Sequence, residues 1–403
     1  MYRLKPYFYD DFHCIGSECC YTCCGGWTIA LGKETVEKYK QCEGYLKRTI
    51  ENNLICWPEM DMYTIRMDKD KMCPFCNEEQ LCMIVKEKGE QFLDGVCKQF
   101  PREKFVSKDM EENYLSLGCP AVVAFLQKCK GTLSFILEDD GKEEEKLKYA
   151  SGKEKKAVEL LYEFIDMDME IRNCMVDILQ NRKWPLWFRE FFVAACLDKI
   201  KDAHNQGKAE EVYGTLKRML EPEFTQTLMV KLVSACRNGE KQFMALRTLT
   251  YSFRDMMDSQ MFSGRNGLYI TKVSELMNQN LNISYEEYRT VCDKWKQKKE
   301  EDFDILAEHI AAYTWMHYAM TAFTKYYMVD NYWDVILVVI LIKHLCIMQY
   351  SLEEELDEKD VEFIVSLVCR TIHHGRTNMG RKLNDLKKVN QLSVASLFML
   401  ISP

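Results

Sequence analysis

The sequence predicts a mainly α protein: a small, irregular, cysteine-rich N-terminal domain with a few short strands, followed by an irregular all-α helical domain. Thirteen of the 19 cysteines lie within residues 1–130, and the other six are spread singly over the rest of the chain. Apolar residues at i, i+3 and i+4 recur almost throughout residues 154–403, as expected of helices with one buried face. A chain of 403 residues also exceeds the size of one compact core. We therefore predict a cysteine-rich domain over 1–130, a charged linker over 131–153 and an α-helical domain over 154–403.

The elements of the N-terminal domain are short. Residues 34–47 carry apolar side chains at helical spacing, which predicts one helix. Over residues 61–68 the side chains form two alternating sets, one for each face of an extended chain, which is typical of a strand. Residues 27–31 predict a second strand. After Cys119 and a proline, the apolar stretch 121–126 predicts the first long helix.

The charge run at residues 138–146 is typical of a solvated loop and places the linker. In the second domain, the most apolar run covers residues 335–342 and ends at Lys343 and His344. A membrane-spanning helix needs about 20 apolar residues, so this run predicts a buried core helix. The helices predicted for the second domain cover residues 154–179, 187–203, 209–219, 224–237, 241–257, 285–299, 305–328, 332–350 and 360–374, with a last segment after Gly380.

The composition excludes some classes of function. The net charge is −8, and no stripe of Lys and Arg is concentrated enough to neutralise a phosphate backbone. We therefore expect no nucleic-acid partner. Residues 1–6 lack the apolar region of a signal peptide. The expectation is a soluble, cytoplasmic protein without a transmembrane segment.

Dense cysteine in a reducing compartment indicates metal ligation or thiol chemistry more often than disulfides. The densest run is C-x4-C-C-x2-C-C-G-G-W over residues 14–27. Thiolates this close repel one another unless a cation holds them, and both zinc and an iron–sulfur cluster accept four cysteines. The irregular spacing favours an iron–sulfur cluster, expected as 4Fe–4S, with zinc as the alternative. The spacing C-x3-C-x2-C of radical S-adenosylmethionine enzymes is absent, because Gly26 stands where its third cysteine would be.

Several motifs follow one another in a characteristic order. They are Y-D-D-F-H-C at residues 9–14, C-C-G-G-W-T-I at 23–29, C-P-F at 73–75, L-C-M-I at 81–84, C-K-Q-F-P-R at 97–102 and L-G-C-P at 117–120. This order resembles the opening of the flagellin lysine-N-methylase (FliB) family. Its front part is also similar to YkgJ-type cysteine-cluster proteins, which are described as zinc- or iron-chelating. The helical remainder fits the family in length and in the segment 372–374.

The resemblance implies a protein-lysine N-methyltransferase that uses S-adenosylmethionine and carries a cysteine-bound iron–sulfur cluster. Its substrate would be flagellin or another lysine-bearing surface protein. Cys20 and Cys76 stand where relatives are expected to have Pro and Leu, so we interpret them as incidental thiols. One cluster needs four ligands, so either two metals bind or some thiols of the pool have other roles. The ligand pool that the resemblance implies is Cys14, Cys19, Cys23, Cys24, Cys73, Cys82, Cys97 and Cys119.

Two residues are candidates for cofactor binding. Trp27 follows a glycine pair and is placed either to shield a metal or stack on a cofactor, or to anchor the core. Arg102 is able to clamp the carboxylate of S-adenosylmethionine with its planar fork, or to form a structural salt bridge instead. No strand is followed by G-x-G, so a Rossmann-type cofactor site is not predicted. No catalytic residue is named.

A second hypothesis explains the cysteines equally well. The protein would then be a non-enzymatic metal- or cluster-binding module with a redox or interaction role. S-adenosylmethionine binding separates the two hypotheses. In the helical domain, the six single cysteines are expected to be small buried hydrophobes. His309 and His317, two turns apart in one predicted helix, are expected to pack in the core.

Overall fold

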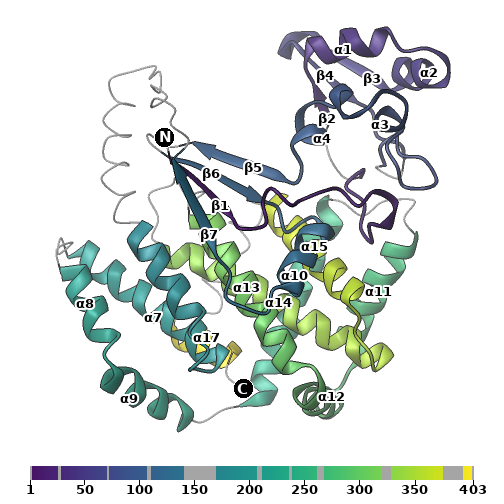
Figure 1. Cartoon of the computed structure of the whole chain (residues 1–403). Coiled ribbons are helices and arrows are strands. Elements are labelled where there is room, and N and C mark those ends of the chain that lie inside the picture. Colours follow the sequence, from purple (N-terminus) through teal and green to yellow (C-terminus); the bar gives the residue numbers. More distant parts are fainter. Residues whose placement is uncertain are drawn as a thin grey trace.

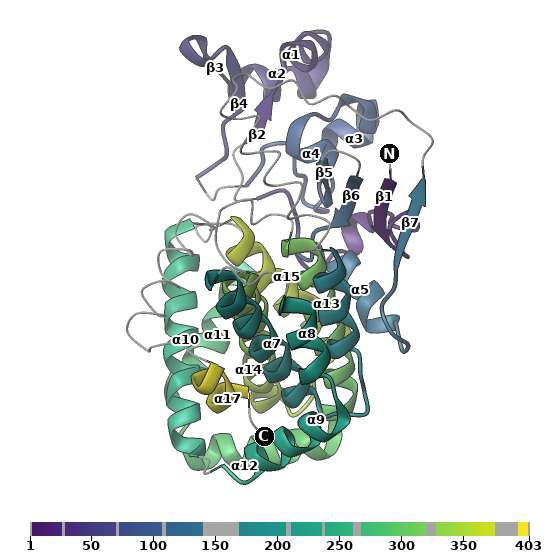
Figure 2. The same cartoon turned by 90° about the vertical axis from the view of Figure 1, so that its left-hand side faces the viewer.

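The protein consists of a small lobe and a larger helical body, with a four-stranded sheet beside their junction (Figure 1; Figure 2). The small lobe comprises the described residues between 29 and 99, and the main body comprises all other described residues. Helices dominate, which confirms the predicted mainly α fold class. This computed structural model describes residues 2–25, 29–69, 72–106, 110–139, 169–206, 211–235, 238–260, 267–319, 328–374 and 394–401.

The small lobe contains a three-stranded antiparallel sheet of order β2-β4-β3. Its strands are β2 (Ile29–Leu31), β3 (Leu54–Trp57) and β4 (Met62–Ile65), of which β2 and β4 confirm the two predicted strands. The single helix predicted over 34–47 is wrong. Gly44 adopts a φ of 62°, a conformation that favours glycine and separates two helices. The helices of the lobe are α1 (Lys33–Lys40), α2 (Gly44–Asn53), α3 (Met83–Lys88) and α4 (Gly95–Gln99).

The four-stranded sheet has the order β5-β6-β1-β7, and none of its strands is predicted by the sequence analysis. Strand β1 runs parallel to β6 and antiparallel to β7. Part of β7 lies in the charge run that predicts a solvated loop, yet Glu138 Oε2 lies 3.0 Å from Lys5 Nζ and the strand pairs with β1. The linker predicted over 131–153 thus contains a strand, and its part from residue 140 lies outside the described residues. The strands are β1 (Tyr2–Pro6), β5 (Arg102–Val106), β6 (Met110–Leu115) and β7 (Phe135–Asp139).

The helices of the main body confirm most of the predicted segments. Helix α5 (Pro120–Lys128) begins at a proline, whose missing N–H is not needed in the first turn. Residues 169–179 are helical, and 154–168 lie outside the described residues. Helix α11 is not predicted. The other helices are α7 (Leu186–Asn205), α8 (Glu211–Met219), α9 (Pro222–Val233), α10 (Gly239–Gln260), α11 (Gly267–Asn282), α12 (Tyr285–Lys298), α13 (Glu300–Ala319), α14 (Met328–Glu353), α15 (Glu358–His374) and α17 (Val394–Ile401).

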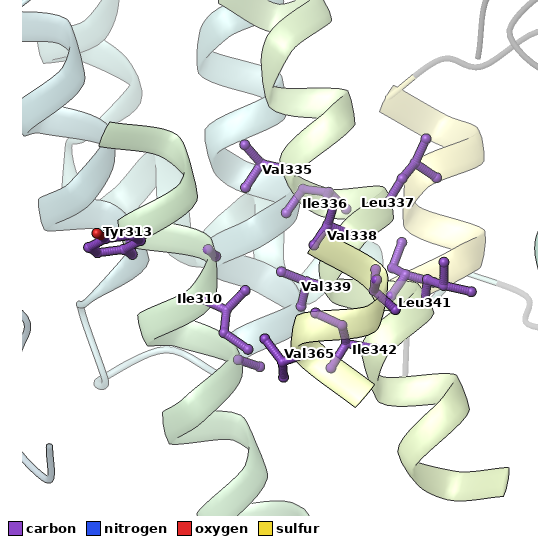
Figure 3. Packing of buried hydrophobic residues seen from close by; sticks show 14 of the residues in the cluster. Ile310, Tyr313, Val335, Ile336, Leu337, Val338, Val339, Leu341, Ile342 and Val365 are labelled. Atoms are coloured by element: carbon purple, nitrogen blue, oxygen red, sulfur yellow. The ribbon is translucent and has the colours of Figure 1, made fainter. Parts of the chain in front are cut away.

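Helix α14 runs through the centre of the main body. Its apolar side chains pack beside those of α13 and α15, as Figure 3 shows for Val335, Val339, Ile310 and Val365. Within α14, Tyr332–Glu353 is long and apolar enough to cross a membrane, but 83% of its most apolar stretch is buried inside the protein. The prediction of a buried core helix is confirmed.

Two separate hydrophobic cores divide the chain. The core of the small lobe includes Ile29, Val36 and Phe75. The core of the main body combines the helices with the inner side of the four-stranded sheet, including Phe8 and Tyr114. The division therefore differs from the predicted boundary at residue 130, because most of β1, β6 and α5 packs on the helices and only the middle of the cysteine-rich segment forms a lobe of its own.

One buried carboxyl group in α7 makes stability depend on pH. Glu190 is 5% exposed, and its Oε1 has no hydrogen-bond partner among the described residues. Burial raises the pKa of this carboxyl from 4.5 to about 8, and neighbouring Asp304 adds to the rise while Lys343 opposes it. A carboxyl that binds its proton more tightly in the folded state stabilises the fold below pH 4.5, and this stabilisation is lost as the pH rises to about 8.

We therefore expect Glu190→Gln to weaken this pH dependence. In the wild type, this group lowers the free energy of unfolding by on the order of a few kcal/mol as the pH rises across that interval. The glutamine variant keeps the shape but has no proton to lose. Urea unfolding of both proteins at several pH values measures the difference. If the free energies of unfolding of the two proteins changed in parallel with pH, Glu190 would have the same pKa in the folded and unfolded states, which would contradict this prediction.

Candidate metal centre

The eight cysteines of the predicted ligand pool come from three parts of the chain. Four lie in the segment after β1, which wraps between the lobe and the body, and three lie in turns and short helices of the small lobe. The last, Cys119, directly precedes α5 in the main body. A backbone hydrogen bond of 2.8 Å from Cys73 N to Cys24 O ties the first segment to the lobe. The fold thus brings distant sequence segments toward one junction.

Cys23 neighbours several other cysteines of this group. Its thiol is close enough to influence the ionisation of thiols from all three parts of the chain. Those neighbours are Cys19, Cys73, Cys82, Cys97 and Cys119. Candidate ligands of both the main body and the small lobe are therefore within electrostatic range of the Cys23 thiol.

The thiols of this group resist ionisation in the absence of a cation. Burial raises the pKa of Cys73, Cys97 and Cys119 to about 12 each, and neighbouring thiols add to the rise. Backbone N–H groups act in the opposite direction at several positions, Cys73 among them. The sulfur of Cys82 accepts from Val85 and Ile84 at the start of α3, and Cys119 accepts in the same way at the start of α5. These donors favour a thiolate, the form that binds metal.

The group also lies between the two hydrophobic cores. Cys119 belongs to the core of the main body, whereas Cys73 belongs to the core of the small lobe. Cys24 and Cys82 pack against the lobe core as well. A metal ligated by sulfurs of both groups would join the lobe to the body, whose hydrophobic cores are separate.

The described residues contain no set of three His, Cys, Asp or Glu side chains already close enough to hold a metal ion. The choice of ligands within the group therefore stays a prediction. Cys76, interpreted from sequence as incidental, lies beside Cys24: a hydrogen bond between their thiols lowers the pKa of Cys76. The sulfur of Cys20 lies 3.9 Å from Glu362 Oε2.

The two candidates for cofactor binding have different outcomes. Trp27 lies outside the described residues. The guanidinium of Arg102 lies 5.1 Å from the centre of the Phe12 ring and donates a hydrogen bond of 3.3 Å to Phe12 O. Within the described part of the chain it forms no ion pair with a carboxylate, so the predicted salt bridge is not found there.

A residue that the sequence analysis missed lies beside the cysteines. Arg370 of α15 is 1% exposed and donates to the backbone oxygens of Thr22 (2.7 Å), Gly118 (2.7 Å) and Tyr21 (3.4 Å). Its guanidinium lies 3.9 Å from the centre of the Tyr21 ring. An arginine on an amphipathic helix carries no signal in the sequence that marks it as buried, so only the fold reveals its position.

The histidines and single cysteines of the body are mostly structural. His309 is buried and bonds to the carbonyl oxygens of Leu126 (3.1 Å) and Gly131 (2.8 Å). His317 stacks on Tyr114 with ring centres 4.8 Å apart, and its Nε2 lies 2.9 Å from Glu103 Oε2. Both pack in the core as predicted. Cys196, Cys346 and Cys369 are buried, Cys174 and Cys292 are partly buried, and Cys236 lies outside the described residues.

Comparison with known proteins assigns the chain to a family. Residues 172–400 match the family model of the FliB lysine N-methylase C-terminal domain. The chain belongs to the FliB lysine N-methylase family. The resemblance found in the cysteine motifs is therefore confirmed by a match in the other part of the chain.

Curated relatives of this FliB-family protein match over a shorter stretch. A segment of 128 residues, 30% of this chain, is 35% identical to the flagellar biosynthetic protein FliU of Salmonella muenchen and covers 73% of it. Two proteins named lysine-N-methylase, from Salmonella choleraesuis and Salmonella typhimurium, are 34% identical over 128 residues. The match spans only 31% of the length of each of these two. No solved structure matches the chain.

Proposed function

We propose that this protein transfers methyl groups from S-adenosylmethionine to lysine side chains of a protein substrate. A cysteine-ligated metal centre, expected to be a 4Fe–4S cluster, is part of the proposal. The coarser assignment, a protein-lysine methyltransferase, follows from membership in the FliB family. The observation that carries the metal centre is the gathering of thiols from three chain segments around Cys23.

The donor set fits a soft metal. Thiolates select zinc, copper(I) and iron–sulfur clusters over hard cations such as magnesium. More thiols are present than the four that one centre needs, and backbone N–H groups favour the thiolate form of several of them. When bound, an iron–sulfur cluster supplies electron-transfer chemistry and offers iron that can take a further ligand. The residues that would hold it are drawn from the eight cysteines of the ligand pool: Cys14, Cys19, Cys23, Cys24, Cys73, Cys82, Cys97 and Cys119.

Arg102 supports the cofactor part of the proposal. Its guanidinium rests on the ring of Phe12, two residues before Cys14, and is more than a third exposed. Only one of its N–H groups is engaged in a hydrogen bond among the described residues, with Phe12 O. The free side of a planar guanidinium binds a carboxylate through two parallel hydrogen bonds, which suits the carboxylate of S-adenosylmethionine.

The acceptor in the proposal is a lysine of flagellin or another surface protein. A curated relative is named a flagellar biosynthetic protein, and others are named lysine-N-methylases. In a polar transfer the methyl carbon leaves the sulfonium sulfur and bonds to the lysine Nζ, so the ammonium must first give up its proton. A cytoplasmic location belongs to the proposal too, because every described cysteine is a free thiol, as in a reducing compartment.

The test is anaerobic purification of the full chain, followed by metal and labile-sulfide analysis and titration with S-adenosylmethionine. The proposal expects iron with a matching amount of sulfide, saturable cofactor binding and methylated lysines on flagellin after incubation. Zinc without sulfide, together with no cofactor binding, would contradict it and leave a metal-stabilised interaction protein. Iron and sulfide without cofactor binding would favour a redox module.

A further inference from the structure

The buried guanidinium of Arg370 has an unusual environment. Arginine stays protonated in proteins, so its charge persists even when the side chain is 1% exposed. Among the described residues its hydrogen bonds go to backbone carbonyl oxygens, and the rings of Tyr21 and Phe100 lie 3.9 and 5.8 Å from its central carbon. No carboxylate of the described residues forms an ion pair with it. A buried charge of this kind is costly unless an anion lies close by.

The carbonyl partners of Arg370 are placed directly beside candidate metal ligands. Thr22 precedes Cys23 in the chain, and Gly118 precedes Cys119. One guanidinium therefore joins two segments that carry candidate ligands and lie about 100 residues apart in the chain. Because α15 belongs to the part of the chain that matches the C-terminal family domain, this contact also links that domain to the cysteines.

We propose that Arg370 is the counter-cation of the cysteine-ligated centre and positions its ligand segments. This inference rests on the metal centre of the proposed function. Four thiolates exceed the positive charge of either Zn²⁺ or an oxidised 4Fe–4S core, so the assembled centre is an anion. A fixed positive charge beside it favours retention of the metal and, for an iron–sulfur cluster, favours uptake of one more electron.

The experiment compares three substitutions in the full, metal-loaded chain. Arg370→Gln removes the charge but keeps an N–H donor, and Arg370→Lys keeps the charge but loses the planar fork. Arg247→Gln is the matched control, because Arg247 also donates to a backbone oxygen, that of Leu281 at 2.6 Å, and lies over an aromatic ring, that of Phe243. Among the described residues, no candidate metal ligand contacts Arg247.

Two measurements decide the proposal. Transfer of metal to a chromogenic chelator is expected to be about tenfold faster for Arg370→Gln and close to wild type for Arg370→Lys and Arg247→Gln. In dye-mediated reductive titrations with dithionite, the midpoint potential of an iron–sulfur centre should fall by about 59 mV in Arg370→Gln, a tenfold change for one electron.

Equal metal loss in the Gln and Lys variants would overturn the proposal, since shape rather than charge would then matter. Wild-type release and potential in Arg370→Gln would overturn it as well. If Arg370→Gln does not fold, Arg370→Lys alone decides: metal release as slow as in the wild type supports a role of the charge, and rapid release contradicts it. A wild-type protein that binds no metal would instead refute the centre itself, and this inference with it.

Discussion

Replacing Cys23 by serine is expected to remove the metal and abolish methyl transfer. Cys23 is the thiol that neighbours candidate ligands on both the small lobe and the main body. Serine keeps the size of the side chain but does not supply a thiolate, which soft metals require. Replacing a residue that only hydrogen-bonds to a metal ligand typically costs about 10- to 100-fold in metal affinity or activity. Because Cys23 is itself a candidate ligand, we expect its loss to cost on the order of 100-fold or more.

The measurements for Cys23→Ser are metal and sulfide content per chain, thermal unfolding, and methylation of the protein substrate. The melting temperature should fall together with metal content, because the centre would join two cores that do not otherwise merge. Cys56→Ser is the matched control: Cys56 is an exposed thiol on β3 and belongs to no family motif. Metal and activity retained in Cys23→Ser, or lost equally in Cys56→Ser, would contradict the proposed centre.

The sequence predicts the helices well for a physical reason. Helix α14 and its neighbours bury one or all faces, so the spacing of apolar residues along the chain records the structure directly. The sheet is different. Strand β6 reads Met-Glu-Glu-Asn-Tyr-Leu, and two adjacent acidic residues give no alternation of apolar and polar side chains. Glu112 is nevertheless fully buried, because Arg172, 60 residues away, pairs with it.

The candidate metal centre is likewise only partly predictable from the sequence. Cysteine density predicts a ligand pool, and the family resemblance names its members. The position of that pool between two cores depends on how β1, α5 and the small lobe pack, which no local pattern encodes. Arg370 escapes prediction too, since its partners are backbone oxygens of residues about 250 and 350 positions away. Every residue has a backbone oxygen, so the amino-acid type of a residue does not reveal that its oxygen accepts from Arg370.

Removing one partner of the buried Arg172–Glu112 pair is expected to destabilise the protein strongly. Arg172 Nη1 and Nη2 lie 3.0 and 2.8 Å from the two oxygens of Glu112, and both side chains are fully buried. The hydroxyl of Tyr114 donates to Glu112 at 2.7 Å, and Arg172 also donates to the backbone oxygen of Met316. The pair thus fastens β6 to the helical segment 169–179 and to α13.

We expect Glu112→Ala to lower the free energy of unfolding by about 3–5 kcal/mol, because it leaves the Arg172 charge buried without its anion. Urea unfolding measures this loss. The double variant Glu112→Leu with Arg172→Met removes both charges and should recover much of the stability, since the unpaired charge rather than the missing attraction dominates the cost. The exposed pair Lys40–Glu37 serves as the control, and Glu37→Ala should leave stability unchanged. If the double variant were as unstable as Glu112→Ala, the ion pair itself would be what holds the sheet to the helices, and the cysteine segment that follows β1 would depend on that attraction for its position.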